Sequence, residues 1–134
     1  MTAHHRLLLG ASAGLALALA AGGQALAADA AHGSAIFKVT CGLCHMASAN
    51  AAKSDLAMRI GPNLWGVVGR HSASLKYFNY SYAMRSSGIV WTNDQLRRYI
   101  AAPQKAVPNV RMSFQGLKNP RDAEDVLAYL STLH

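Results

Sequence analysis

The feature that most constrains the fold is the run Cys41-Gly42-Leu43-Cys44-His45, which holds the only two cysteines among the 134 residues. Two thiols three residues apart on one helical turn can add to the two vinyl groups at one edge of a porphyrin. The imidazole that follows can then bind the iron from one side. The spacing therefore predicts a haem attached covalently through Cys41 and Cys44, with His45 as one iron ligand.

Other uses of the cysteine pair fit the rest of the sequence less well. A thioredoxin-like Cys-x-x-Cys needs a βαβ context, and no alternating strand pattern accompanies this pair. A structural zinc site needs four ligands, commonly from two such pairs, and the chain has one. A free pair in an oxidising compartment would tend to form a disulfide. We therefore interpret the pair as a haem-attachment motif.

Residues 1–27 have the order of a secretory signal. A short polar opening with Arg6 precedes an apolar run over residues 7–21, and Ala25 and Ala27 supply small residues at a cleavage site. An uncleaved anchor is the weaker alternative, because a membrane span needs roughly 20 apolar residues. We predict cleavage after Ala27, a periplasmic location and a single domain over residues 28–134.

The charge of that domain indicates the chemistry of its partners. Of the 13 basic residues only Arg6 lies in the leader, which leaves 12 against 6 acidic residues, a net charge of +6. This balance favours an anionic partner such as the acidic face of another protein. The basic residues are scattered and form no run of five, so nucleic acid is not an expected partner. We expect a monomer with at most peripheral membrane contact.

The periodicity of apolar residues predicts an all-α domain with long loops. Helices are expected over residues 29–39 and 92–102, with a short one within 76–85 and a last one that begins at Pro120 after the cap Asn119. Thr92 caps the second long helix, and Pro103 ends it. Residues 46–59 are expected to form a surface excursion, 61–69 turns and 104–116 an irregular segment. The expected core positions are Ile36, Phe37, Leu96, Tyr99, Ile100, Val126, Leu127, Leu130 and Leu133.

A bound iron needs a sixth ligand or an open position. The candidates from the sequence are His71, a lysine and four methionines: Met46, Met58, Met84 and Met112. Met46 adjoins His45 and cannot reach the opposite face of the haem. Buried methionines are usually core residues, so none of the others is singled out by its type. Met112 differs in its position, in an irregular Pro-containing segment between two helices.

These residues together resemble the class I c-type cytochromes, a family that includes mitochondrial cytochrome c and its bacterial periplasmic relatives. The likeness runs from Gly33 to Leu130. It includes Gly33 and Phe37 ahead of the attachment motif, the run 61–64 with Gly69-Arg70, and the segment 108–114. The resemblance implies a small class I cytochrome c fold, with three to five helices and long loops around one covalently bound haem c.

The resemblance also implies roles for residues that face the haem. Pro62 would accept a hydrogen bond from the other ring nitrogen of His45, a contact that fixes the ring and tunes the iron. Arg70, Tyr80 and Trp91 would lie near the haem propionates. As bare residues, the aromatic ones would more often be plain core.

The same resemblance implies the remaining contacts on the distal side. Tyr99 would lie near the axial methionine. Met112, with Pro108, Arg111 and Phe114 around it, matches the family's methionine-ligand loop and would be the sixth ligand of the iron.

The sequence departs from the mitochondrial pattern at several places. The loop between His45 and Pro62 is about five residues longer, so the family's contacts do not transfer to it. Val110 and Met84 replace polar residues that the family often places near the haem. The basic residues around the expected haem edge are only partly kept, as Arg59, Lys105, Arg111 and Lys118.

The resemblance implies an electron-transfer protein of a respiratory chain rather than an enzyme. We expect a periplasmic one-electron carrier that docks on acidic faces of a quinol–cytochrome c oxidoreductase, a terminal oxidase or a periplasmic dehydrogenase. One alternative is a dedicated electron-acceptor subunit of a specific periplasmic dehydrogenase. Another is a five-coordinate haem sensor or peroxidase, and a third is a haem-free binding module.

Overall fold

The computed structural model describes residues 27–134. The signal peptide predicted over residues 1–27 therefore lies outside the described residues except for Ala27. No helix within residues 27–134 is long and apolar enough to cross a membrane. This part of the chain contains six α-helices and one 3-10 turn: α1 (Ala30–Val39), η1 (Cys41–Leu43), α2 (Lys53–Ala57), α3 (Tyr82–Ser86), α4 (Asn93–Ala101), α5 (Pro103–Ala106) and α6 (Pro120–Leu130).

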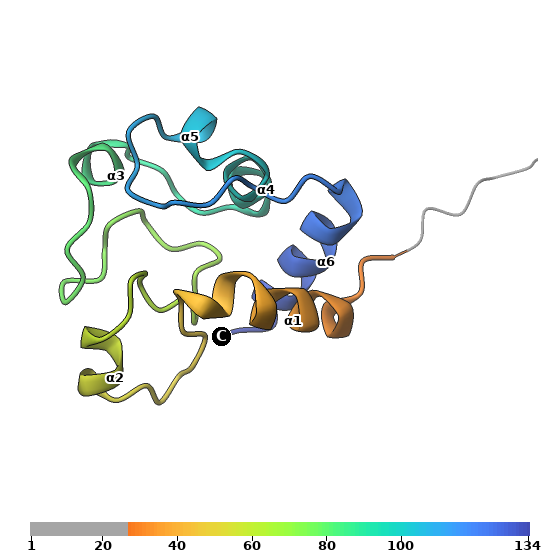
Figure 1. Ribbon diagram of the computed structural model, residues 1–134, viewed down its shortest axis with the longest axis horizontal. Helices are drawn as coiled ribbons and strands as arrows, with labels where there is room; N and C mark the ends of the chain where they lie inside the picture. Colours follow the sequence, from red (N-terminus) through yellow and green to blue (C-terminus); the bar gives the residue numbers. More distant parts are fainter. Residues whose placement is uncertain (1–26) are drawn as a thin grey trace, which may run out of the picture.

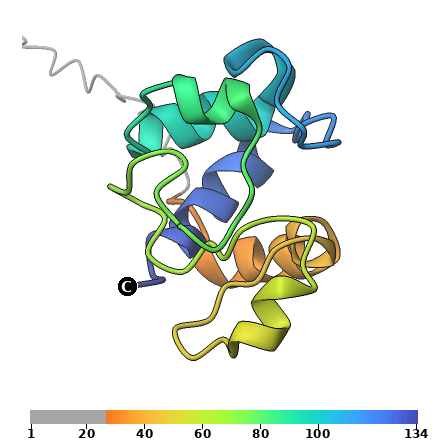
Figure 2. The ribbon, with the colours of Figure 1, turned by 90° about the vertical axis from the view of Figure 1, so that its left-hand side faces the viewer.

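The helices form two groups joined by long loops (Figure 1). One group contains α1 and α2, and the other contains α3, α4 and α5. Helix α6 packs on both α1 and α4, so it joins the two groups. The turned view shows the same arrangement, with the segment between α2 and α3 running from one group to the other (Figure 2).

The crossing of α1 and α6 is the main helix contact and depends on a glycine. Gly33 is buried there, and a Cβ at this position would lie 1.8 Å from the carbonyl oxygen of Asp125. The backbones therefore touch without an intervening side chain. One helical turn further along, the rings of Phe37 and Tyr129 pack with centroids 5.2 Å apart. Gly33 and Phe37, two of the residues that carry the family resemblance, thus both lie where the first helix meets the last.

The ends of the long helices follow the predicted caps. The Thr92 hydroxyl accepts a hydrogen bond from the N–H of Gln95 over 3.2 Å at the start of α4. The Asn119 side chain accepts one from the N–H of Arg121 over 3.0 Å, and Pro120 occupies the first position of α6. These side chains satisfy N–H groups that have no partner within the helix.

The all-α prediction is confirmed, and its details need two corrections. The expected count was three to five helices, and the described residues contain six because α2, α3 and α5 are single turns of four or five residues. The irregular segment expected over 104–116 begins instead with α5, since Pro103 ends α4 and starts the next turn. The only strand-like pairing between residues 27 and 134 is an isolated bridge of His71 and Val90.

The core contains the side chains that the periodicity predicted. Helix α4 buries Leu96, Tyr99 and Ile100, and α6 with the residues after it buries the last apolar stripe. Ile36 is the exception, because it is only partly buried and packs on the edge of this core. The buried apolar residues are Phe37, Val67, Met84, Trp91, Leu96, Tyr99, Ile100, Val107, Val110, Ala123, Val126, Leu127, Leu130 and Leu133.

Candidate functional site

The cysteine pair lies on one tight turn that directly follows α1. The N–H groups of Cys44 and His45 both donate to the carbonyl of Cys41, over 3.0 and 2.8 Å. Both thiols are free and partly buried. Burial raises the pKa of the Cys41 thiol, and the hydroxyl of Thr40 opposes that shift from 3.5 Å. Two thiols on one turn, followed at once by an imidazole, match the expected attachment geometry.

The imidazole of His45 is held in one orientation by the backbone of the following loop. Its Nδ1–H donates to the carbonyl of Pro62 over 2.8 Å, which leaves Nε2 as the lone-pair nitrogen. Burial lowers the pKa of His45, and the bond to Pro62 opposes this shift. The ring is therefore kept neutral with Nε2 as the donor atom, which is the state that a metal needs.

Gly61 provides the close approach that this contact requires. A Cβ on Gly61 would lie 2.3 Å from Cε1 and 2.5 Å from Nδ1 of His45. The N–H of Gly61 also donates to the carbonyl of Cys44 over 3.0 Å. The loop thus lies directly against the ring and is tied to the attachment turn. This cradle, together with the two thiols, fits a covalently bound haem whose iron would be held by Nε2 of His45.

Arg70 organises the loop behind His45. Its Nη1 donates to the carbonyl of Trp65 over 3.0 Å, and its Nη2 donates to that of Asn63 over 2.9 Å. Burial lowers the pKa of the guanidinium, whereas Tyr80 and Tyr77 raise it. The resemblance implies a role for this side chain toward a haem propionate, whereas its two hydrogen bonds to loop carbonyls were not expected from the sequence.

Three aromatic residues named by the resemblance lie in or on the core. The rings of Trp91 and Tyr99 pack with centroids 4.9 Å apart and an interplanar angle of 57°. Burial raises the pKa of Tyr99 to about 12. Tyr80 is partly buried and packs edge-on against Phe78, with ring centroids 4.8 Å apart. The N–H of Trp91 donates to the carbonyl of Arg70 over 2.9 Å, and the N–H of Gly69 donates to the carbonyl of Trp91 over the same distance. These bonds connect Trp91 to the loop that carries Arg70.

Met112 lies on a loop that is fixed at several points. It is partly buried and packs against the core that contains Trp91 and Tyr99. The side-chain amide of Gln104 donates to the carbonyls of Val110 and Met112, over 2.9 and 3.2 Å. No sequence pattern pointed to Gln104. These bonds hold the loop that carries Met112 against the apolar core.

Asn63 is a further residue that the sequence interpretation did not single out. Its side-chain oxygen accepts from the N–H of Ser48 over 3.2 Å and from that of Trp65 over 3.1 Å. Its amide donates to the carbonyl of Ser48 over 2.7 Å. Its own N–H donates to the hydroxyl of Tyr77 over 3.0 Å. The Pro-Asn pair was a turn signal that would have indicated this role.

This small helical domain combines a cysteine pair for attachment, a fixed neutral imidazole and an apolar interior. These features define the class of proteins that hold a covalently bound haem. Comparisons with known proteins agree with this class. A family model described as cytochrome c matches residues 30–134. The chain belongs to the cytochrome c family.

Individual relatives cover nearly the whole domain. The chain is 43% identical to cytochrome c2 of Rhodopila globiformis over 113 residues, which are 83% of this chain and 99% of that protein. It is 40% identical to cytochrome c2 of Rhodomicrobium vannielii over 124 residues, 92% of this chain and 94% of that protein. The solved structure of cytochrome cH from Methylobacterium extorquens aligns with a TM-score of 0.67 at 34% identity, and the match covers 78% of this chain and 98% of that one.

Membership of this family establishes the general function. The chain is an electron carrier and not an enzyme, and its cofactor is covalently attached haem c. Cys41 and Cys44 fit the attachment motif.

Proposed function

We propose that this chain is a periplasmic one-electron carrier whose haem iron is held by His45 and Met112. Bound haem c supplies the reversible exchange of one electron. The observation that carries the proposal is the 2.8 Å hydrogen bond from His45 Nδ1 to the carbonyl of Pro62. It fixes the tautomer, so that Nε2 is the nitrogen available to iron, and it raises the basicity of that ligand.

Met112 supplies the second axial ligand in this proposal. A thioether favours ferrous iron, and in an apolar pocket it raises the reduction potential. With both axial positions taken by side chains, no position remains at which a substrate could bind iron. Electron transfer through the edge of the haem is then the remaining function. The hydrogen bonds from Gln104 to the carbonyls of Val110 and Met112 support this role, because they restrain the loop that carries the proposed ligand.

The residues around these ligands complete the site. Arg70 has five N–H donors, and the loop carbonyls use two of its nitrogens, so further donors remain for a haem propionate. Tyr80 and Trp91 are proposed as the other groups near the propionates, and Tyr99 as the tyrosine near Met112. The hydroxyl of Tyr99 is neutral at physiological pH, as in any tyrosine, so it can donate a hydrogen bond.

Carbon monoxide binding tests the closed iron site. The reduced wild-type holoprotein is expected to bind carbon monoxide little or slowly. A Met112→Ala variant is expected to bind it rapidly. Met58→Ala is the matched control, because the Met58 side chain is exposed and is not proposed as an iron ligand. Rapid binding by the wild type would contradict the proposal and favour a five-coordinate sensor or peroxidase.

We further propose a free carrier that docks on acidic faces of a quinol–cytochrome c oxidoreductase, a terminal oxidase or a periplasmic dehydrogenase. The net charge of +6 in residues 28–134 supports this, because positive charge speeds encounters with acidic faces. Turnover rates should fall steeply as ionic strength rises. Rates that do not change with salt would contradict electrostatic docking, and stable co-purification with one dehydrogenase would favour the fixed-subunit alternative.

Export is the remaining part of the proposal. Cleavage after Ala27 would release the domain of residues 28–134 into the periplasm. The intact mass of the holoprotein from a periplasmic fraction should equal residues 28–134 plus one haem. A mass that includes residues 1–27 would contradict cleavage.

A further inference from the structure

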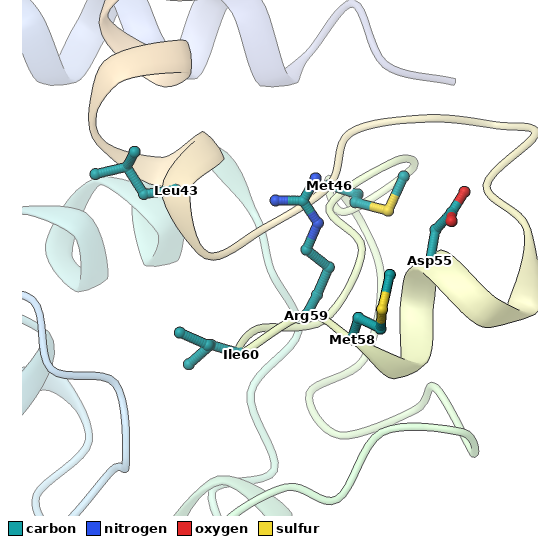
Figure 3. A pocket seen from close by; sticks show the side chains of 6 residues that line it. All are labelled: Leu43, Met46, Asp55, Met58, Arg59 and Ile60. Atoms are coloured by element: carbon teal, nitrogen blue, oxygen red, sulfur yellow. The ribbon is translucent and has the colours of Figure 1, made fainter.

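An exposed apolar surface is formed by one residue of the attachment turn and two residues of the loop between His45 and Pro62. Leu43, Met58 and Ile60 are 71%, 80% and 78% exposed. All three line one hollow of about 390 Å³, together with Met46, Asp55 and Arg59. We call Leu43, Met58 and Ile60 the apolar shelf. Figure 3 shows Leu43 on one side of the hollow, Met58 and Asp55 on the other, and Arg59 between them.

The shelf is held in place at both of its sides. Arg59 Nη1 donates to the carbonyl of Gly42 over 3.3 Å, within the attachment turn. The N–H of Gly61 donates to the carbonyl of Cys44 over 3.0 Å, directly after Ile60. The shelf is therefore positioned next to Cys44, the second of the two attachment cysteines. None of its three side chains joins the apolar core of residues 27–134.

Large apolar side chains that gather on a surface in this way mark an interaction site more often than isolated ones do. The charge of the segment that carries the shelf indicates the kind of partner. Between Lys38 and Ile60 the basic residues are Lys38, Lys53 and Arg59, and Asp55 is the only acidic one. A partner that covers the shelf should therefore present carboxylates around an apolar centre.

We infer that the apolar shelf is a docking surface for an acidic redox protein, which places an apolar side chain in the hollow beside Cys44. This inference rests on the proposed function and adds a specific contact to it. A contact centred on three side chains suits a transient encounter, as is usual for electron-transfer partners. A second copy of this chain fits poorly, because its own shelf has the same positive surroundings. A flat lipid surface would leave the hollow unfilled.

Oxidation of the reduced holoprotein by washed membranes of its own organism tests the inference. In the double variant Met58→Ser with Ile60→Ser, KM should rise about tenfold with kcat nearly unchanged, since the change removes an apolar anchor and leaves charge intact. Met58→Leu with Ile60→Val should keep the wild-type KM. Tyr82→Ser removes another exposed apolar side chain, 79% exposed and outside the hollow, and should also leave KM unchanged.

Two further readouts separate the outcomes. Oxidation by hexacyanoferrate, which needs no protein docking site, should be equal in all variants and so reports an intact haem site. The ratio of variant to wild-type KM should stay constant as salt rises, because no charge is altered. An unchanged KM in the double variant would overturn the shelf proposal while leaving the proposed carrier function in place.

The remaining outcomes are also decisive. Failure of the membranes to oxidise the wild type would contradict the carrier function, and the shelf proposal would fall with it. Loss of binding to anionic phospholipid vesicles in the double variant, with KM unchanged, would assign the surface to a membrane. A concentration-dependent dimer that disappears in the double variant, again with KM unchanged, would assign it to a second copy of the chain.

Discussion

Replacement of Gly33 by alanine tests the account of the α1–α6 crossing, because two physical effects predict opposite signs. Alanine in a helix interior is favoured over glycine by about 1 kcal/mol, so propensity alone predicts a more stable protein. The structure predicts the opposite. The added Cβ would lie 1.8 Å from the carbonyl oxygen of Asp125, 2.3 Å from its carbon and 2.8 Å from the nitrogen of Val126.

The size of the effect follows from these contacts. All three atoms belong to the backbone, so no side-chain rotation can relieve the clash. The helices must separate by roughly 1 Å or more to reach ordinary contact distances. That movement loosens Phe37 and Val126, which are buried where the two helices meet. Overpacking of a core costs about 1–3 kcal/mol, and we expect Gly33→Ala at or above the upper end of this range.

Denaturant unfolding of the holoprotein measures the change in the free energy of unfolding. In thermal unfolding, a loss of about 3 kcal/mol would lower the midpoint temperature by roughly 10–20 °C in a domain of this size. Gly42→Ala is the matched control, because the nearest atom to its added Cβ is the carbonyl oxygen of Phe37 at 3.3 Å. An unchanged or higher stability of Gly33→Ala would refute the reasoning about this crossing.

Three further predictions concern individual side chains. Gly61→Ala should displace the ring of His45, weaken its bond to the carbonyl behind it and shift the reduction potential, which potentiometry measures; an unaltered potential would count against the cradle. The pKa of His32 is raised above 6.5, chiefly by the hydrogen bond from its ring to the carboxylate of Asp125. Asp125→Asn should return this pKa toward 6.5, which an NMR titration measures. In the wild type the stability from this pair is full below pH 6.5 and is lost as pH rises through the raised pKa, a dependence that the variant should lack. Stability should also fall between pH 10 and about 12, because the unfolded state releases the Tyr99 proton first, and Tyr99→Phe should reduce that fall in unfolding measured against pH.

The long helices could be predicted from the sequence because several local signals agree there. Thr92 and Asn119 mark the starts of α4 and α6 by their capping chemistry, and the apolar spacing of Leu96 and Val126 with their neighbours marks the buried faces. The single turns α2 and α5 could not be predicted in the same way. Four or five residues contain too few apolar positions to show a helical period.

The parts of the candidate site that consist of local sequence motifs could be predicted. The attachment turn and the contact of His45 with Pro62 follow from a motif and a family resemblance. The contacts of Arg70 with loop carbonyls depend on the conformation of the loop, which no pattern specifies. The hydrogen bond between His32 and Asp125 joins residues 93 positions apart. It depends on the helix crossing, so no local sequence pattern predicts it.

The most direct test of the central claim is the proton NMR spectrum of the reduced holoprotein. A methionine bound to ferrous haem iron lies over the porphyrin, whose ring current moves its methyl resonance far upfield. We predict one such resonance, which is absent from Met112→Leu and present in Met58→Leu. A resonance that persists in Met112→Leu, or that the wild type lacks, would contradict the closed site formed by His45 and Met112.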